Sequence, residues 1–591
     1  MIKLLRRLSS MEWLQAALSV VFIVTQVWLD LKLPDYMNEV TRLITSENAS
    51  MSDIWRNGGY MLLCTLGSAA SAIIVGFFAA RIGSSFARRM RSFLFNKVES
   101  FSMEEINRFS TASLITRSTN DITQVQMLIT MGLMVIVKAP ITAVWAVTKI
   151  VGKGFEWTMA TAGATGLLLV FIGFIIIAVF PRFRTMQTLT DNLTRVSREN
   201  LTGLRVIRAY NAEEYQDGKF TRANDEFTGV QLFTGRAMSL MMPVMTVVMS
   251  GLNLLINWIG AVVINGVTDA GGLEAQLTER GLLFSNMVVF SMYAMQVIMS
   301  FMMLVMIFIF LPRASVSAKR INEVLETEPA VLGGGLIEGN PELTGEVEFR
   351  NDRFRYPGAA EDVLRDVSFT AKRGETVAFI GSTGSGKSTL INLVPRFFDA
   401  TEGEILIGGV NVRSYTLEAL YRKIGYVPQK AALFRGTVAE NVAYGDSPKG
   451  LDGVKAAAAI AQSADFIEAM EGCYEADVAQ AGANLSGGQK QRLAIARAVC
   501  RKPELYIFDD SFSALDYKTD RLLRDALKRE TAGVTSLIVA QRVGTVMDAD
   551  RIVVLDEGRV VGIGTHRELL KTCAVYKEIA ASQLSEEELS A

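Results

Sequence analysis

A glycine-rich stretch has the residue types and the spacing needed to bind phosphate. In VAFIGSTGSGKSTLINLV, the pattern G-x-x-x-x-G-K-S extends from Gly381 to Ser388 between an apolar run and a helix-forming run. Glycines let backbone N–H groups converge on phosphate oxygens, while the lysine contacts the terminal phosphates and the serine hydroxyl ligates magnesium. The pattern predicts that ATP and Mg²⁺ are bound by Gly381, Ser382, Thr383, Gly384, Ser385, Gly386, Lys387, Ser388 and Thr389.

An aspartate at the end of another apolar run completes the expected metal site. Asp509 follows LYIF, which has the composition of a buried strand. A carboxylate in this place ligates the magnesium ion directly or through a bound water, together with Ser388.

A second phosphate-binding surface is expected in NLSGGQKQRLAIARA. Ser486, Gly487 and Gly488 open a run typical of a helix, and a serine with two backbone amides at a helix N-terminus favours phosphate. One domain has no use for two such surfaces on a single nucleotide. We therefore expect the second surface to close on a nucleotide held by another copy of the domain.

The length and composition of the chain indicate that a membrane part is joined to a soluble part. The chain has 591 residues, of which 50% are hydrophobic and 20% charged, too apolar for a soluble protein and too charged for one wholly in lipid. A net charge of −1 and the lack of a basic patch with interleaved aromatics argue against nucleic acid as a partner. The four widely spaced cysteines and the single histidine, His566, predict neither a zinc site nor a histidine-based triad.

The first 311 residues contain about six apolar stretches, each near the ~20 residues that cross a bilayer as a helix. They are residues 14–33, 60–80, 127–148, 159–180, 239–264 and 282–311. The connections at 82–126 and 181–238 are polar, rich in basic residues and helical in periodicity, which predicts helices that continue into the cytoplasm. Both termini are then cytoplasmic.

The pattern changes after the last stretch. Short apolar strands alternate with helices, as in TVAFIG, IGYVP, LYIFD and SLIVA, which is typical of an α/β domain. We predict an α-helical membrane domain with six transmembrane helices at 1–325, a linker at 326–343 and an α/β P-loop nucleotide-binding domain at 344–591.

These ordered motifs cover nearly the whole chain, which resembles an ABC exporter half-transporter: six spans fused to one nucleotide-binding domain. The resemblance implies that Tyr356 stacks on adenine and that Gln429 contacts the magnesium and the γ-phosphate. It also implies that LSGGQ, Leu485 to Gln489, is the signature sequence and that SALD, ending at Asp516, crosses a dimer interface. The segment around Tyr210 to Tyr215 is expected to be a coupling helix.

Three residues depart from the family pattern. Asp510 replaces the glutamate that orients and deprotonates the attacking water, and Gln541 replaces a histidine that contacts the γ-phosphate. Gln480 replaces a glutamate common just before the signature sequence. Aspartate is as basic as glutamate, but its carboxylate is withdrawn by ~1 Å, and a displacement of that order lowers a rate on the order of 100-fold. We predict a site that binds ATP, because every phosphate-binding residue is kept, and hydrolyses it poorly, with Asp510, Gln541 and Gln429 at the catalytic positions; neutral drift is the alternative.

An intact signature sequence beside a weak hydrolytic site predicts a heterodimer with a second half-transporter, as in bacterial multidrug exporters that pair a degenerate with a competent site. The expected function is ATP-driven export of small amphipathic or drug-like compounds across the bacterial cell (inner) membrane. A lipid or peptide translocator and an ATP-regulated membrane sensor are the alternatives.

The membrane part offers two further candidates. Methionines recur at spacings of three and four in the last two spans, Met295 and Met299 among them, and suit either a surface for varied apolar ligands or plain packing. Lys138 lies in the middle of a span, where a charge favours a pathway role. Snorkelling or a structural pair with Asp30 is the alternative.

Overall fold

The computed structural model describes residues 2–45, 50–267, 273–445, 450–530 and 532–585. Its contacts divide the chain into two units, one of Met1–Lys97 with Ala112–Glu326 and one of Val98–Thr111 with Thr327–Ala591. The short segment Val98–Thr111 thus belongs with the C-terminal unit, where Glu105 Oε1 accepts a hydrogen bond of 2.9 Å from the Ala330 amide. The sequence-based prediction had assigned this segment to the membrane domain at 1–325.

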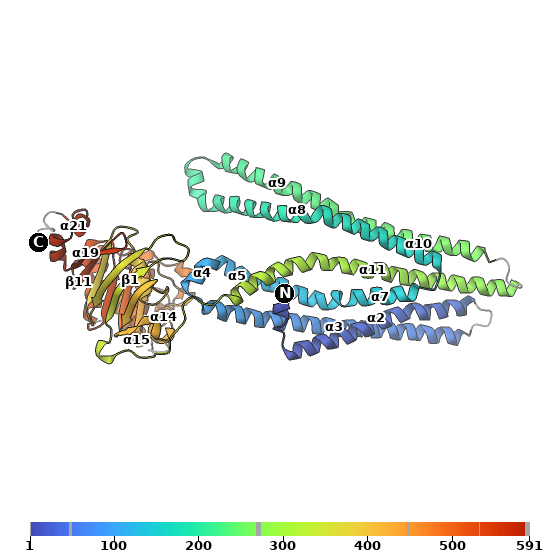
Figure 1. The fold of residues 1–591 in the computed structure, drawn as a ribbon, viewed down its shortest axis with the longest axis horizontal. Coiled ribbons are helices and arrows are strands. Elements are labelled where there is room, and N and C mark those ends of the chain that lie inside the picture. Colours follow the sequence, from blue (N-terminus) through green and yellow to red (C-terminus); the bar gives the residue numbers. More distant parts are fainter. Residues whose placement is uncertain (1, 46–49, 268–272, 446–449, 531, 586–591) are drawn as a thin grey trace. The chain divides into compact units, whose positions relative to one another are not determined.

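The first unit is built from long helices (Figure 1). They are α1 (Ile2–Leu5), α2 (Ser10–Thr45), α3 (Met51–Glu99), α5 (Thr111–Thr116), α6 (Ile122–Met131), α7 (Lys138–Ile150), α8 (Phe155–Ala209), α9 (Glu213–Ser239), α10 (Met241–Asn265) and α11 (Leu273–Glu326). Six candidate membrane spans lie within them, and the expected stretches fall on these helices. Helices of 49 to 55 residues, such as α3, α8 and α11, exceed the ~20 residues that a bilayer needs, so they continue beyond it. The predicted fold class is confirmed.

The third span is not a uniform α-helix. Between α5 and α7 it contains two π-helical segments, Arg117–Asp121 and Gly132–Ile136. Pro140, in the first turn of α7, has no N–H to donate to the carbonyl four residues earlier, which belongs to Ile136. The second π-helical segment therefore lies where this helical hydrogen bond is missing.

The tip between α8 and α9 differs from the expected coupling helix. Tyr210 to Ala212 form a turn, and α9 begins at Glu213, so no separate helix spans Tyr210 to Tyr215. Asn211 takes a left-handed backbone with φ of 52°, which ends α8 and reverses the chain. Both tyrosines of this tip are exposed.

The second unit holds two main sheets. The first has the order β2-β1-β4-β5 and is antiparallel, and the second has the order β12-β11-β3-β10-β9-β6, in which β12 alone is antiparallel. The strands are β1 (Val347–Phe354), β2 (Leu364–Ala371), β3 (Thr376–Gly381), β4 (Glu402–Ile407), β5 (Val410–Asn411), β6 (Ile424–Val427), β9 (Leu505–Asp509), β10 (Thr535–Val539), β11 (Arg551–Asp556) and β12 (Arg559–Gly564). A small ladder joins β7 (Gly436–Thr437) to β8 (Asp477–Val478). The strand expectations missed β2 and β12, and also the two-residue strands β5, β7 and β8.

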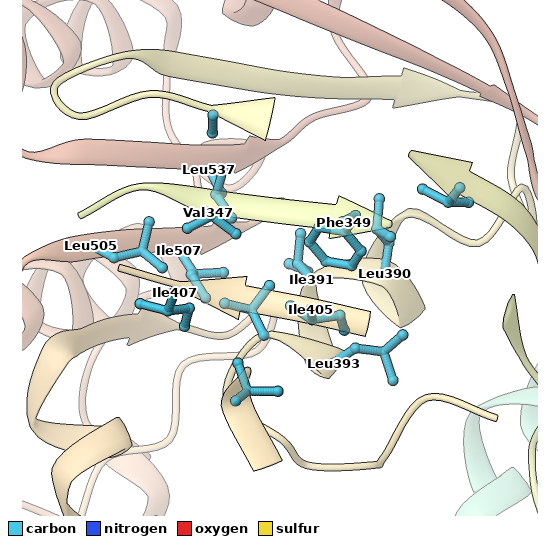
Figure 2. Close-up of a cluster of buried hydrophobic side chains, with 14 of the residues drawn as sticks. Val347, Phe349, Leu390, Ile391, Leu393, Ile405, Ile407, Leu505, Ile507 and Leu537 are labelled. Atoms are coloured by element: carbon cyan, nitrogen blue, oxygen red, sulfur yellow. The ribbon is translucent and has the colours of Figure 1, made fainter. Parts of the chain in front are cut away.

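Helices complete this unit. They are α4 (Met103–Phe109), α12 (Lys387–Leu393), α13 (Leu417–Lys423), α14 (Val438–Val442), α15 (Gly450–Ile460), α16 (Ala464–Glu468), α17 (Gly487–Arg501), α18 (Tyr517–Glu530), α19 (Val543–Val546), α20 (His566–Thr572) and α21 (Ala574–Ala581). Figure 2 shows the apolar core around α12, where Leu390 and Ile391 lie near Val347 and Phe349 of β1. This packing fixes the helix that follows the phosphate loop.

Asp352 is a polar exception in that core-facing strand. It is fully buried on β1, and neither carboxylate oxygen has a hydrogen-bond partner. Burial raises the pKa of Asp352 to about 7, although the Arg413 charge opposes the shift. The group is therefore protonated in the folded chain below neutral pH.

Candidate nucleotide site

The phosphate loop follows β3, which lies between β10 and β11 in the parallel sheet. The loop ends in Gly386, whose φ of 96° is left-handed, and a Cβ there would stand 2.8 Å from Leu364 Cδ2. The chain then enters α12 at Lys387. The predicted strand, glycine-rich turn and helix are thus present in this order.

Lys387 lies folded into the loop. Its Nζ donates to the carbonyl oxygens of Gly381 at 2.9 Å and Ser382 at 2.8 Å, and to Ser385 Oγ at 3.3 Å. Burial lowers the pKa of Lys387, and the nearby charges of Asp510 and Asp509 oppose this shift. No ion pair among the described residues involves Lys387. A buried ammonium held only by neutral oxygens fits a site that receives phosphate.

The two expected metal ligands are in direct contact. Ser388 Oγ donates to Asp509 Oδ1 at 2.8 Å, although 121 residues separate them in the chain. Burial raises the pKa of Asp509, and the hydrogen bond from Ser388 opposes the shift. A hydroxyl and a carboxylate are hard oxygen ligands of the kind that Mg²⁺ prefers, so the pair fits this ion. A bound Mg²⁺ would neutralise charge on the phosphates.

The carboxylate of Asp510 is held by two glutamines. Its Oδ2 accepts from Gln541 Nε2 at 2.9 Å and from Gln429 Nε2 at 3.2 Å. Burial raises the pKa of Asp510, and the bonds from Gln429 and Ser513 oppose the shift. The backbone of Asp510 is left-handed, with φ of 45°. The three predicted catalytic residues therefore meet, but both amide groups occupy the same carboxylate oxygen.

Tyr356 is held in place by its neighbours. Its hydroxyl lies 3.0 Å from Thr389 Oγ1, and its ring packs edge-on against Phe354 and Phe398, at centroid distances of 4.8 and 5.3 Å. The tyrosine is thus fixed beside the end of the phosphate loop. Stacking on adenine stays a prediction.

The signature sequence opens α17. Ser486 is its N-cap: Ser486 Oγ accepts from the Gln489 amide at 3.3 Å, and Gln489 Oε1 accepts from the Ser486 amide at 2.9 Å. Gly487 and Gly488 form the first turn. Among the described residues, no hydrogen bond joins the signature sequence to the phosphate loop.

The membrane part brings charged residues together in pairs. Lys138 Nζ lies 3.4 Å from Asp30 Oδ2, and Ser68 Oγ donates to Asp30 Oδ1 at 2.5 Å. The structural pair with Asp30 was the alternative to a pathway role for Lys138, and this contact supports it.

A second charged pair was not anticipated from the sequence. Lys149 Nζ lies 2.7 Å from Asp35 Oδ2, and the hydroxyl of buried Tyr293 donates to Asp35 Oδ1 at 2.6 Å. The sequence does show that Asp35 and Lys149 each lie just after an apolar stretch, and this position could have suggested that the two residues pair.

The fold and this site define an ABC transporter with the two parts of a half-transporter in one chain. The family model "ABC transporter transmembrane region" matches residues 16–301, and the model "ABC transporter" matches residues 364–513. The chain belongs to the ABC transporter family, whose nucleotide-binding domains bind ATP and power transport. It is a multi-pass membrane protein.

Particular relatives match most of the chain. An uncharacterised ABC transporter ATP-binding protein of Mycobacterium tuberculosis H37Rv is 39% identical, and the match covers 93% of each chain. The ATP-dependent lipid A-core flippase of Pseudomonas putida is 33% identical over 80% of this chain and 76% of its own. The solved structure of a bacterial Atm1-family ABC exporter with ATP bound has the same fold, with a TM-score of 0.76, 23% identity and coverage of 97% and 98%.

Proposed function

We propose that this chain is one subunit of an ATP-driven exporter of amphipathic compounds, with a degenerate ATP site of its own and a signature sequence that serves a second subunit. The exporter lies in the bacterial inner membrane with both termini in the cytoplasm. Residues that bind the nucleotide and Mg²⁺ are all present, which supports tight ATP binding.

One observation supports a degenerate site: Gln541 and Gln429 both donate hydrogen bonds to the same carboxylate oxygen of Asp510, Oδ2. A base must approach the water that it deprotonates within hydrogen-bond distance. The shorter side chain of Asp510 withdraws its carboxylate by ~1 Å relative to glutamate, and a displacement of that order lowers a rate on the order of 100-fold. Gln541 can donate a hydrogen bond but carries no charge.

The class of transported compound is proposed from the residues of the last two spans. Drug-like amphiphiles suit the methionines of the last two spans, whose thioethers adapt to varied apolar ligands. A lipid substrate is the second candidate, because several relatives about one third identical are lipid A-core flippases. Transport assays with labelled lipid and labelled drug in inverted vesicles separate these candidates. A sensor would show no ATP-dependent uptake of either.

The hydrolytic proposal is tested by rescue. The partner's catalytic carboxylate is first removed, so that hydrolysis depends on the site built from Lys387, Ser388 and Asp509. Asp510→Glu is then expected to restore some ATPase activity, and Asp510→Glu with Gln541→His at least several-fold more. ATP affinity should change little, because the phosphate-binding residues are untouched.

Lys387→Ala in the double variant is the control, since it removes phosphate binding and should abolish the restored activity. An unmodified site that turns over ATP as fast as the partner's site contradicts the proposal. A damaged signature sequence in the partner would block rescue for a separate reason, so that sequence must be verified first.

A further inference from the structure

A groove of about 450 Å³ lies between α10 and α11, close to the connection that joins them. It is lined by Asn257, Ala261, Asn265, Arg280, Phe284 and Met287. Gly260 allows the two helices to approach here, since a Cβ in its place would stand 2.2 Å from Met287 Sδ. The groove therefore combines a cation and two amides with an apolar floor.

Arg280 has an unused hydrogen-bond donor in this groove. Its Nη2 donates to the carbonyl of Val267 at 3.0 Å, just after the end of α10. Its Nε is buried and has no hydrogen-bond partner. Among the described residues, no carboxylate forms an ion pair with Arg280. A buried guanidinium donor without an acceptor is unfavourable, so an anionic acceptor from outside the chain would stabilise it.

The polar side of the groove continues along α10. Asn253, Asn257 and Asn265 are spaced by four and eight residues and lie on one side of the helix. Asn253 Oδ1 accepts from Ser291 Oγ of α11 at 2.7 Å and from Asn257 Nδ2 at 3.1 Å. All three asparagines are exposed within or at the end of a membrane span, where polar side chains are costly against lipid tails.

An apolar surface runs directly beside this polar stripe. Leu254 and Trp258 directly follow Asn253 and Asn257, Val262 lies one turn further along the helix, and the three side chains are 60–70% exposed. A molecule with a polar anionic head and an apolar tail would satisfy both surfaces together, while a free anion would satisfy the polar one alone.

We propose that the groove between α10 and α11 binds the anionic headgroup of a membrane amphiphile. Arg280 pairs with a phosphate or carboxylate oxygen, and guanidinium groups bind such oxygens in planar geometry. Asn265 supplies a further donor, and the apolar chain lies along Phe284 and Met287. This binding requires neither ATP hydrolysis nor a particular exported compound.

The test measures retained lipid on the intact complex, without nucleotide. Wild-type, Arg280→Gln and Arg280→Lys complexes are extracted from vesicles of phosphatidylglycerol and phosphatidylcholine and analysed by native mass spectrometry. The wild type should retain several-fold more phosphatidylglycerol than phosphatidylcholine. Arg280→Gln should abolish this preference, and Arg280→Lys should keep part of it because the charge remains.

Arg56→Gln is the matched control. Arg56 is an arginine of α3 that already pairs with Asp53 at 3.2 Å, so its loss should leave the lipid preference unchanged. Inorganic phosphate added at millimolar concentration distinguishes a free anion from a lipid headgroup. Equal retention of phosphatidylglycerol by wild type and Arg280→Gln overturns the proposal, as does its complete displacement by phosphate.

A second variant guards against misfolding. Asn265→Leu removes a donor from the groove without touching Arg280, and it should lower phosphatidylglycerol retention while the unfolding midpoint stays near that of wild type. Unchanged retention in Asn265→Leu and Arg280→Lys, with Arg280→Gln failing to assemble, would also refute an anion site. None of these results bears on hydrolysis at Asp510.

Discussion

Two polar contacts, one in each unit, join residues at similar separations in the chain. Ser388 and Asp509 are 121 residues apart, and Asp30 and Lys138 are 108 residues apart. The first pair follows from rules of the α/β fold, because the loop and helix after β3 and the last residue of β9 lie at the same carboxyl edge of a parallel sheet. The second pair depends on how helices pack.

This difference separates two kinds of side chain. In the ATP-binding unit, polar groups that take part in chemistry stand in motifs whose local backbone sets their direction. In the membrane unit, a polar group has no motif, and its partner is set by helix packing over the length of a span. Variants that remove or exchange such partners should therefore behave differently in the two units.

The largest expected effect concerns Asp352, a polar group of the ATP-binding unit that belongs to no motif. Since its folded-state pKa is about 7 and its ordinary value is near 4, the folded chain keeps a proton that the unfolded chain loses. The contribution of Asp352 to stability is greatest below pH 4 and falls as pH rises to 7, by up to roughly 4 kcal/mol. Asp352→Val should remove this loss.

The measurement is the unfolding midpoint of the full chain at pH 5 and pH 8, with the exposed Asp525→Ala variant as control. Asp352→Val should gain more at pH 8 than at pH 5. An equal gain at both pH values would show that Asp352 is not the titrating group.

The next largest effect is expected when the pair of Lys138 and Asp30 in the membrane unit is broken. Lys138→Met leaves Asp30 without its cation in a partly buried position, which should lower stability by about 2 kcal/mol. Adding Asp30→Asn should restore at least half of the loss, because the amide keeps a partner in Ser68. Thermal unfolding of the four variants in detergent gives the coupling energy.

If Lys138→Met leaves unfolding unchanged but abolishes substrate stimulation of the ATPase, the lysine acts in the pathway and the contact with Asp30 is incidental. Lys149→Met offers a comparison, since the same change there removes the cation beside Asp35.

A smaller effect on stability is expected at Ser486, where variants can distinguish its role as a helix cap from a role in binding phosphate. Ser486→Ala removes an N-cap and should destabilise the first turn of α17 by about 1 kcal/mol. Ser486→Asp keeps the cap but places a negative charge where phosphate is expected. Hydrogen exchange in residues 487–491 should increase in Ser486→Ala alone, while hydrolysis at the partner's site should fall in both variants.

Thr437→Ala, which removes the equivalent cap of α14, is the control. Normal hydrolysis in Ser486→Asp would show that the serine acts only as a cap.

The smallest effect on stability is expected at Met299. Its side chain is 45% exposed in the single chain, so Met299→Ala should change stability by less than about 0.5 kcal/mol. Transport of several substrates should change unequally if this face contacts them. A uniform decrease for all substrates would assign the methionine to packing, and buried Met245 provides that comparison.

The sequence predicted the fold class, the strands around the phosphate loop and the six spans, because each follows from hydrophobic periodicity or from a local motif. Gln541 was recognised as a replacement, but its bond to Asp510 depends on two loops that only the folded sheet brings together. The Asp35 contact with Tyr293 joins residues 258 apart, and no local pattern encodes it. Strand β2 was missed because polar residues interrupt its apolar positions.

The two π-helical segments of the third span, Arg117–Asp121 and Gly132–Ile136, affect how this chain is compared with its relatives. An α-helix advances by about 100° per residue, and a π-helical turn takes up one additional residue. The angular phase of α7 is therefore offset from that of α5 by the extra residue in each π-helical segment. An angular position for Lys138 that is counted from Leu114 at 3.6 residues per turn is therefore wrong by roughly 200°. A relative that lacks one of these residues would present a different set of side chains to α2, even where the aligned letters are identical.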